Sequence, residues 1–113
     1  MKTHSIHLHN EPFSLIKNGG KKIESRLLDE KRRDFTVGDQ LFFENRINGE
    51  KLKSIIINLY KYNSFEELYE NHPLIAFGGS TKKELLQDVY KFYSKEDEKK
   101  FGVVGIEFIL ETL

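Results

Sequence analysis

The sequence contains no cysteine, which excludes disulfides, cysteine-ligated zinc and thiol catalysis. It has no apolar run near the roughly 18 residues of a membrane span. The first ten residues, MKTHSIHLHN, also lack the continuous apolar segment of a signal peptide. Net charge is absent too: 18 Lys and Arg balance 18 Asp and Glu, which argues against a protein that coats nucleic acid through bulk charge. These absences predict a cytoplasmic protein that does not act at a membrane.

The length and composition of the chain fit a single folded domain. Folding of 113 residues buries roughly two thirds of the surface that the unfolded chain exposes, so a core can form without disulfides or metal. Nine Phe and five Tyr supply large side chains for that core. No proline or Ser/Gly-rich run marks a linker, and no repeat is present. We therefore treat residues 1–113 as one domain.

Local signals mark the ends of several elements. The Asn18–Gly20 stretch is typical of a helix C-terminus, and Asn48 followed by Gly49 indicates a tight hairpin. Ser64 followed by Glu67 matches a capping box at the start of a helix. With hydrophobic periodicity, these signals predict strands at 4–9, 21–28, 40–45, 52–62 and 103–113, helices at 10–18, 64–72, 81–94 and 95–102, and loops at 29–39 and 73–80.

The order of the main elements, β-α-β-β-β-α-α-β, predicts the fold class. The strands cluster around a hairpin, and no βαβ rhythm recurs, which disfavours a doubly wound parallel sheet. We predict an α+β fold, namely a small, mainly antiparallel β-barrel or strongly curved sheet with helices packed outside. A two-layer α+β sandwich is the alternative.

Three sequence patterns could indicate a metal, phosphate-binding or nucleophilic site. His7 and His9 lie two apart on a strand and so share a face, as metal ligands can, with His4, His72 or a carboxylate as a third ligand. An exposed polar face is the simpler interpretation, because no H-x-x-E or cysteine partner accompanies them. The glycine pair in FGGS lacks the full spacing of a phosphate loop, and no G-x-S-x-G elbow occurs. No metal or cofactor is therefore expected.

The segment GGKKIESR, residues 19–26, combines a helix stop with the start of a charged strand. In a strand, Glu24 and Arg26 share one face, and Ile23 and Leu27 share the core-facing side. Six cations occur within residues 21–33, against three acids. The segment is either a solvated strand edge or the rim of a binding site.

The same segment resembles a known family. Gly19-x-Lys21-x-x-Glu24-x-Arg26 is similar to the G-x-K-x-x-E-x-R signature of ASCH domains, and the flanking sequence resembles small stand-alone bacterial and archaeal members over nearly the whole chain. The resemblance implies a PUA-like pseudo-barrel with flanking helices and a cleft lined by Lys21, Glu24 and Arg26. It further implies binding of RNA or a nucleotide-like ligand. We also expect Asn45 and Arg46, at the end of the LFFENR segment, near the same rim.

Some relatives are enzymes, and this gives an alternative function. One branch removes the acyl group from N4-acetylcytidine with a lysine, a threonine and a distant glutamate. Lys21 matches that lysine, but Glu24 stands where the branch has its threonine, so the hydroxyl is missing. A hydrolase of a modified nucleoside, or a ribonuclease, would have to use Lys21 and Glu24 as its proton-handling pair.

Overall fold

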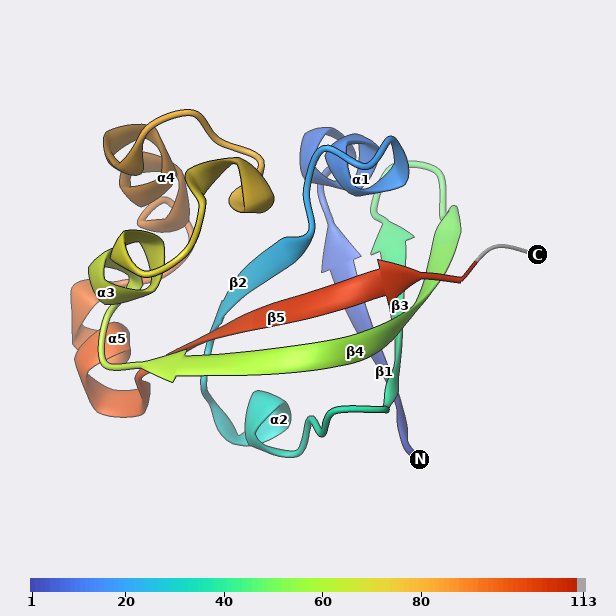
Figure 1. Cartoon of the computed structure of the whole chain (residues 1–113), viewed down its shortest axis with the longest axis horizontal. Helices are drawn as coiled ribbons and strands as arrows, with labels where there is room; N and C mark the ends of the chain where they lie inside the picture. The colour runs from blue at the N-terminus through green and yellow to red at the C-terminus, as the bar shows by residue number, and fades with distance from the viewer. Residues whose placement is uncertain (112–113) are drawn as a thin grey trace.

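The computed structural model describes residues 1–111 and contains one five-stranded mixed sheet (Figure 1). The strand order across the sheet is β1-β3-β4-β5-β2, so β1 and β2 form its two edges. β1 runs parallel to β3, and all other neighbours are antiparallel. The strands span Thr3–Leu8 (β1), Ile23–Leu27 (β2), Gln40–Asn45 (β3), Lys51–Tyr62 (β4) and Val103–Leu110 (β5).

Helices occupy the connections between these strands. The helical segments span Asn10–Lys17 (α1), Glu30–Arg33 (α2), Phe65–Glu70 (α3), Leu74–Phe77 (η1, a 3-10 helix), Lys82–Val89 (α4) and Lys95–Phe101 (α5). The order of helices and strands along the chain follows the prediction, except that two short helical segments, α2 and η1, were not predicted. None of the helices in residues 1–111 is long and apolar enough to cross a membrane.

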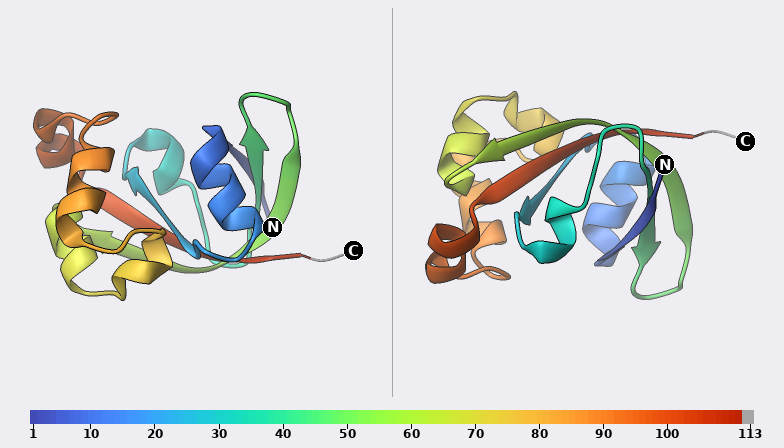
Figure 2. Two further views of the ribbon diagram at one scale, coloured as in Figure 1. Left: turned by 90° about the horizontal axis from the view of Figure 1, so that it is seen from above. Right: turned by 90° about the horizontal axis from the view of Figure 1, so that it is seen from below.

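The sheet curls strongly, which gives the half-barrel shape of a PUA-like α+β fold. β4 is twelve residues long and carries an irregularity in its pairing with β5 between Ile56 and Asn58. Such bulges increase the local twist and bend a strand. In both views of Figure 2, α1 lies inside the curve of the sheet. The predicted curved, mainly antiparallel sheet is confirmed.

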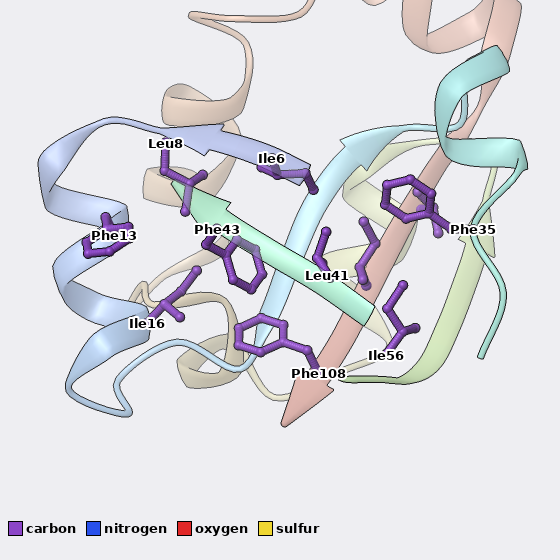
Figure 3. Packing of buried hydrophobic residues seen from close by; sticks show 11 residues of the cluster. Ile6, Leu8, Phe13, Ile16, Phe35, Leu41, Phe43, Ile56 and Phe108 are labelled. Atoms are coloured by element: carbon purple, nitrogen blue, oxygen red, sulfur yellow. The ribbon is translucent and has the colours of Figure 1, made fainter. Parts of the chain in front are cut away.

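Two hydrophobic clusters pack on opposite faces of the sheet. The first fills the space between α1 and the inner face, where Phe13 and Ile16 of α1 lie near Phe43 of β3 and Phe108 of β5 (Figure 3). The second joins α3, η1 and α4 to β2 and the start of β5, through residues that include Phe65 and Leu68. β2 contributes Ile23 and Leu27 to the second cluster.

Three local predictions were wrong. Residues 29–39 are not all loop, because the Asp29 carboxylate accepts the Arg32 backbone N–H and caps the short helix α2. Residues 73–80 contain the 3-10 helix η1. The helix predicted at 81–94 ends at Val89, and Ser94 begins a new helix by accepting the Asp97 N–H. The predicted Ser64 cap is confirmed, since its hydroxyl accepts the Glu67 N–H.

Candidate functional site

The end of α1 positions the first residue of the site. Gly19 has φ +85°, a conformation that glycine adopts without steric cost. This turn directs the N–H groups of both Gly20 and Lys21 to the Leu15 carbonyl, at 2.8 and 3.1 Å. The Lys22 N–H then donates to the Ala76 carbonyl of η1 at 2.7 Å. Backbone hydrogen bonds on both sides thus fix the position of Lys21, two residues before β2 begins.

Glu24 lies between the two cations of the signature. Its Oε1 is 2.5 Å from Lys21 Nζ, and its Oε2 accepts from Arg26 Nε at 2.8 Å. The Glu24 side chain is 4% exposed, whereas the Lys21 and Arg26 side chains are 13% and 15% exposed. The interpretation as a solvated strand edge is therefore wrong, because Glu24 is a buried carboxylate with a cation on either side.

The charges of this cluster stabilise one another. Burial alone would raise the pKa of Glu24, but Lys21 and Arg26 outweigh it and hold that pKa below its ordinary value. Burial would likewise lower the pKa of Arg26, but Glu24 and the nearby Tyr93 raise it above its ordinary value. Glu24 is thus ionised at neutral pH, and the three side chains together carry one net positive charge.

Arg26 also links the two edges of the sheet. Its Nη2 donates to the His7 carbonyl of β1 at 3.3 Å. β1 and β2 share no backbone ladder in the described chain, so this contact bridges the open side of the half-barrel. Glu24 pairs with Ile106 and Arg26 with Val104 across the β2–β5 ladder, and paired side chains share a face. The cluster therefore lies on the inner side of the sheet. We call the line along which the edge strands β1 and β2 meet, bridged by Arg26 and the His7 carbonyl, the seam of the sheet.

The opposite face of β2 packs into the hydrophobic core. Ile23 and Leu27 are buried in the second hydrophobic cluster, as the period of two predicts. Ser25 accepts a hydrogen bond from the Tyr69 hydroxyl at 3.1 Å. Burial, with a smaller contribution from Glu24, raises the pKa of Tyr69 well above its ordinary value. The predicted separation of β2 into a core face and a charged face is confirmed.

Arg46 lies outside the ion-pair cluster. It is exposed in the β3–β4 turn, and its backbone N–H donates to the Leu8 carbonyl at 2.9 Å. Its backbone is thus anchored one residue beyond the His7 carbonyl that Arg26 contacts. Asn45, beside it, is buried and donates to the Asn10 side chain. The role of Arg46 at a shared rim stays a prediction.

The histidines considered as metal ligands do not converge. His7 Nε2 lies 2.5 Å from Glu44 Oε2, and the His9 ring lies 5.4 Å from the Phe92 ring. His72 contacts Tyr60 on the other side of the sheet. Residues 1–111 contain no group of three or more His, Asp or Glu side chains arranged to hold a metal ion.

Sequence reasoning missed the segment that joins α4 to α5. It assigned Phe92 and Tyr93 to one long helix, whereas the structure places Tyr93 near Arg26 and Phe92 against His9. Ser94 followed by Asp97 is a helix-cap pattern, and it could have indicated the break. No local signal indicates which distant residues these rings contact.

Comparisons with known proteins identify the family of the chain. The family model described as the ASCH domain matches residues 6–112. The chain belongs to the ASCH domain family. A comparison with functionally curated proteins found no match.

Solved structures show that the chain also shares its fold with ASCH-domain proteins. The crystal structure of hypothetical protein PH0355 is 38% identical, with a TM-score of 0.86 over 98% of this chain and 100% of that chain. The solution NMR structure of PF0455 from Pyrococcus furiosus is 39% identical, with a TM-score of 0.78 and full coverage of both chains. ZmASCH from Zymomonas mobilis is 12% identical with a TM-score of 0.66, over 98% of this chain and 68% of that chain, and supports the fold alone.

Proposed function

We propose that this ASCH domain binds RNA or a nucleotide-like ligand at the cluster of Lys21, Glu24 and Arg26. The observation that carries the proposal is the buried Glu24 carboxylate, which holds two cations in fixed positions at the seam of the sheet. Both cations remain partly exposed, and the cluster keeps an excess positive charge. An anionic ligand at the seam would complete this charge distribution.

The hydrogen-bonding capacity of the cluster supports the same class of ligand. Lys21 has three N–H donors, and one contact to Glu24 leaves donors for a phosphate oxygen. The Arg26 guanidinium contacts Glu24 and the His7 carbonyl, which leaves further N–H donors in its planar fork. Glu24 fixes the orientation of both, so little side-chain freedom is lost when a ligand binds.

The test is a binding titration with a short single-stranded RNA at about 50 and about 200 mM salt. Lys21→Ala combined with Arg26→Ala should weaken binding at least about tenfold and reduce the salt dependence, because phosphate contacts are lost. Thermal melts establish that the double variant is folded at the assay temperature, since it leaves Glu24 buried without a cation. Lys83→Ala combined with Lys99→Ala is the matched control, since it removes two exposed cations of α4 and α5, outside the Lys21–Arg26 cluster. Equal affinities for the two double variants, or binding that ignores salt, would contradict the proposal.

A hydrolase acting on a modified nucleoside is the second candidate. The observation that favours it is the 2.5 Å contact between Lys21 Nζ and Glu24 Oε1, a geometry suited to moving a proton. Incubation with N4-acylated cytidines and short RNAs, followed by mass spectrometry, is the test. Turnover that disappears in both Lys21→Ala and Glu24→Gln would support catalysis. Intact substrates after prolonged incubation with folded protein would exclude these reactions.

A further inference from the structure

An exposed aromatic ring lies beside the candidate site. Phe92, in the segment between α4 and α5, is 62% exposed. Among the exposed large hydrophobic side chains of residues 1–111, it is the only aromatic one. Exposing a phenyl ring forgoes the favourable burial of a large apolar surface. An aromatic ring left in solvent on the residue before Tyr93, which lies near Arg26, calls for a functional explanation.

Phe92 reaches across to the first half of the chain. Its ring centroid lies 5.4 Å from that of His9, the residue that precedes α1, with the planes inclined by 31°. His9 follows β1 two residues after His7, whose carbonyl accepts from Arg26. Figure 2 shows that α1 and α4 lie on opposite sides of β2. The Phe92–His9 pair therefore joins the α4 side of β2 to the α1 side. It lies near Arg26, at one end of the cluster of Lys21, Glu24 and Arg26.

The segment that carries Phe92 is held in place. The N–H groups of Phe92 and Tyr93 both donate to the Val89 carbonyl at 3.1 Å, and Ser94 caps the next helix. The Tyr93 ring stacks on the buried Phe65 at 5.8 Å. Tyr93 is thus anchored in the core, and Phe92 beside it projects outward. The position of Phe92 is fixed by the fold rather than by its own burial.

We infer that Phe92, supported by His9, stacks the unpaired base of a nucleotide in a single strand. The phosphate of that nucleotide, or the polar edge of its base, contacts Lys21 and Arg26. The inference rests on the proposed function and narrows the ligand to single-stranded RNA. Bases in single strands offer both faces, and stacking on aromatic side chains is a common mode of their recognition. A base within a duplex is already stacked and cannot lie flat on Phe92.

The experiment compares three probes: a short single-stranded RNA, the same strand carrying abasic residues, and the corresponding duplex. Phe92→Ala should weaken binding of the single strand by about fivefold to a hundredfold, and Phe92→Tyr should retain it. Binding of the abasic strand should be weak in the wild type and unchanged by Phe92→Ala. Ile75→Ala is the control, since Ile75 is 76% exposed on η1. Thermal melts confirm that each variant is folded.

The outcomes separate this inference from the function on which it rests. If Lys21→Ala with Arg26→Ala weakens binding but Phe92→Ala behaves like Ile75→Ala, base stacking is overturned and the charged site stands. Duplex binding as tight as single-strand binding also overturns it. If the wild-type protein binds none of the three probes, the proposed RNA-binding function itself fails, and the inference fails with it.

Discussion

At the scale of single residues, Glu24 determines the character of the site. A carboxylate that is buried without partners would be protonated, but two cations keep this one ionised. The network holds two long, flexible cationic side chains in one arrangement at a buried carboxylate. Removing one partner of such a buried pair leaves the others uncompensated, so the cost exceeds that of losing a surface ion pair.

Glu24→Gln should therefore destabilise the protein by about 3–5 kcal/mol near neutral pH, because Lys21 and Arg26 lose the buried charge between them. Urea unfolding of both forms measures the difference. Glu44→Gln is the control: Glu44 pairs with His7 and Lys51 at a half-buried position, and its loss should cost about 0–1 kcal/mol. Equal costs for the two variants would contradict the account of Glu24.

Asp39 gives a pH-dependent contribution to stability. Hydrogen bonds from His4, and then from the backbone N–H groups of Lys2 and Thr36, lower the pKa of Asp39 from 3.8 to about 2. Because the folded-state pKa is depressed, its contribution is complete above about pH 4 and is lost as the pH falls toward 2.

Asp39→Asn should make stability less dependent on pH across that window, since the variant has no carboxylate to protonate. Thermal melts of both proteins between about pH 5 and about pH 2 provide the measurement. The melting temperature of the wild type should fall further than that of the variant between these two pH values. Parallel curves would show that Asp39 does not contribute in this way.

At the scale of elements, close packing sets the position of α3 over the sheet. Gly105 of β5 pairs with Ser25 of β2, and α3 crosses above it. A Cβ atom at Gly105 would lie 2.8 Å from Leu68 Cδ1 and 3.2 Å from Ile23 Cγ2. Leu68 is fully buried, so it has little room to move away. The glycine is required by this approach of helix to strand.

Gly105→Ala should destabilise the protein by about 1–3 kcal/mol through overpacking. Chemical denaturation of Gly105→Ala, Leu68→Val and the double variant tests the cause. If the clash with Leu68 is responsible, the double variant should be less destabilised than the sum of the two single variants. Strict additivity would place the cause elsewhere.

The sequence predicted elements better than contacts between them. The hairpin at Gly49, the Ser64 cap and the two faces of β2 all follow from local rules, and the structure has each of them. The starts of α5 and α2 depend on caps at Ser94 and Asp29, which hydrophobic periodicity does not indicate. Local patterns therefore suffice for most of the fold.

The site is a different matter, because tertiary contacts create it. The period of two places Glu24 and Arg26 on one face, but it does not predict that this face is buried. Lys21 precedes the strand and reaches Glu24 only because the α1 turn directs it there. The approach of Phe92 to His9 joins residues far apart in the chain.

At the scale of the whole molecule, the sheet curls until its edge strands β1 and β2 approach one another. They are bridged by Arg26 rather than by a backbone ladder. α1 and the first hydrophobic cluster fill the inner side, and α3, η1 and α4 cover the other face of β2. The seam is thus a place where two halves of the chain contribute charged and aromatic side chains to one surface. The central claim is that this seam binds the ligand.

The most direct measurement is a titration of isotope-labelled protein with a short single-stranded RNA, followed by the chemical shifts of backbone amides. The account predicts that the largest changes occur at residues 21–26 and 91–93, and that they disappear when Lys21→Ala and Arg26→Ala are combined. Changes confined to other surfaces, such as α2 and α5, or no changes at saturating RNA, would contradict it.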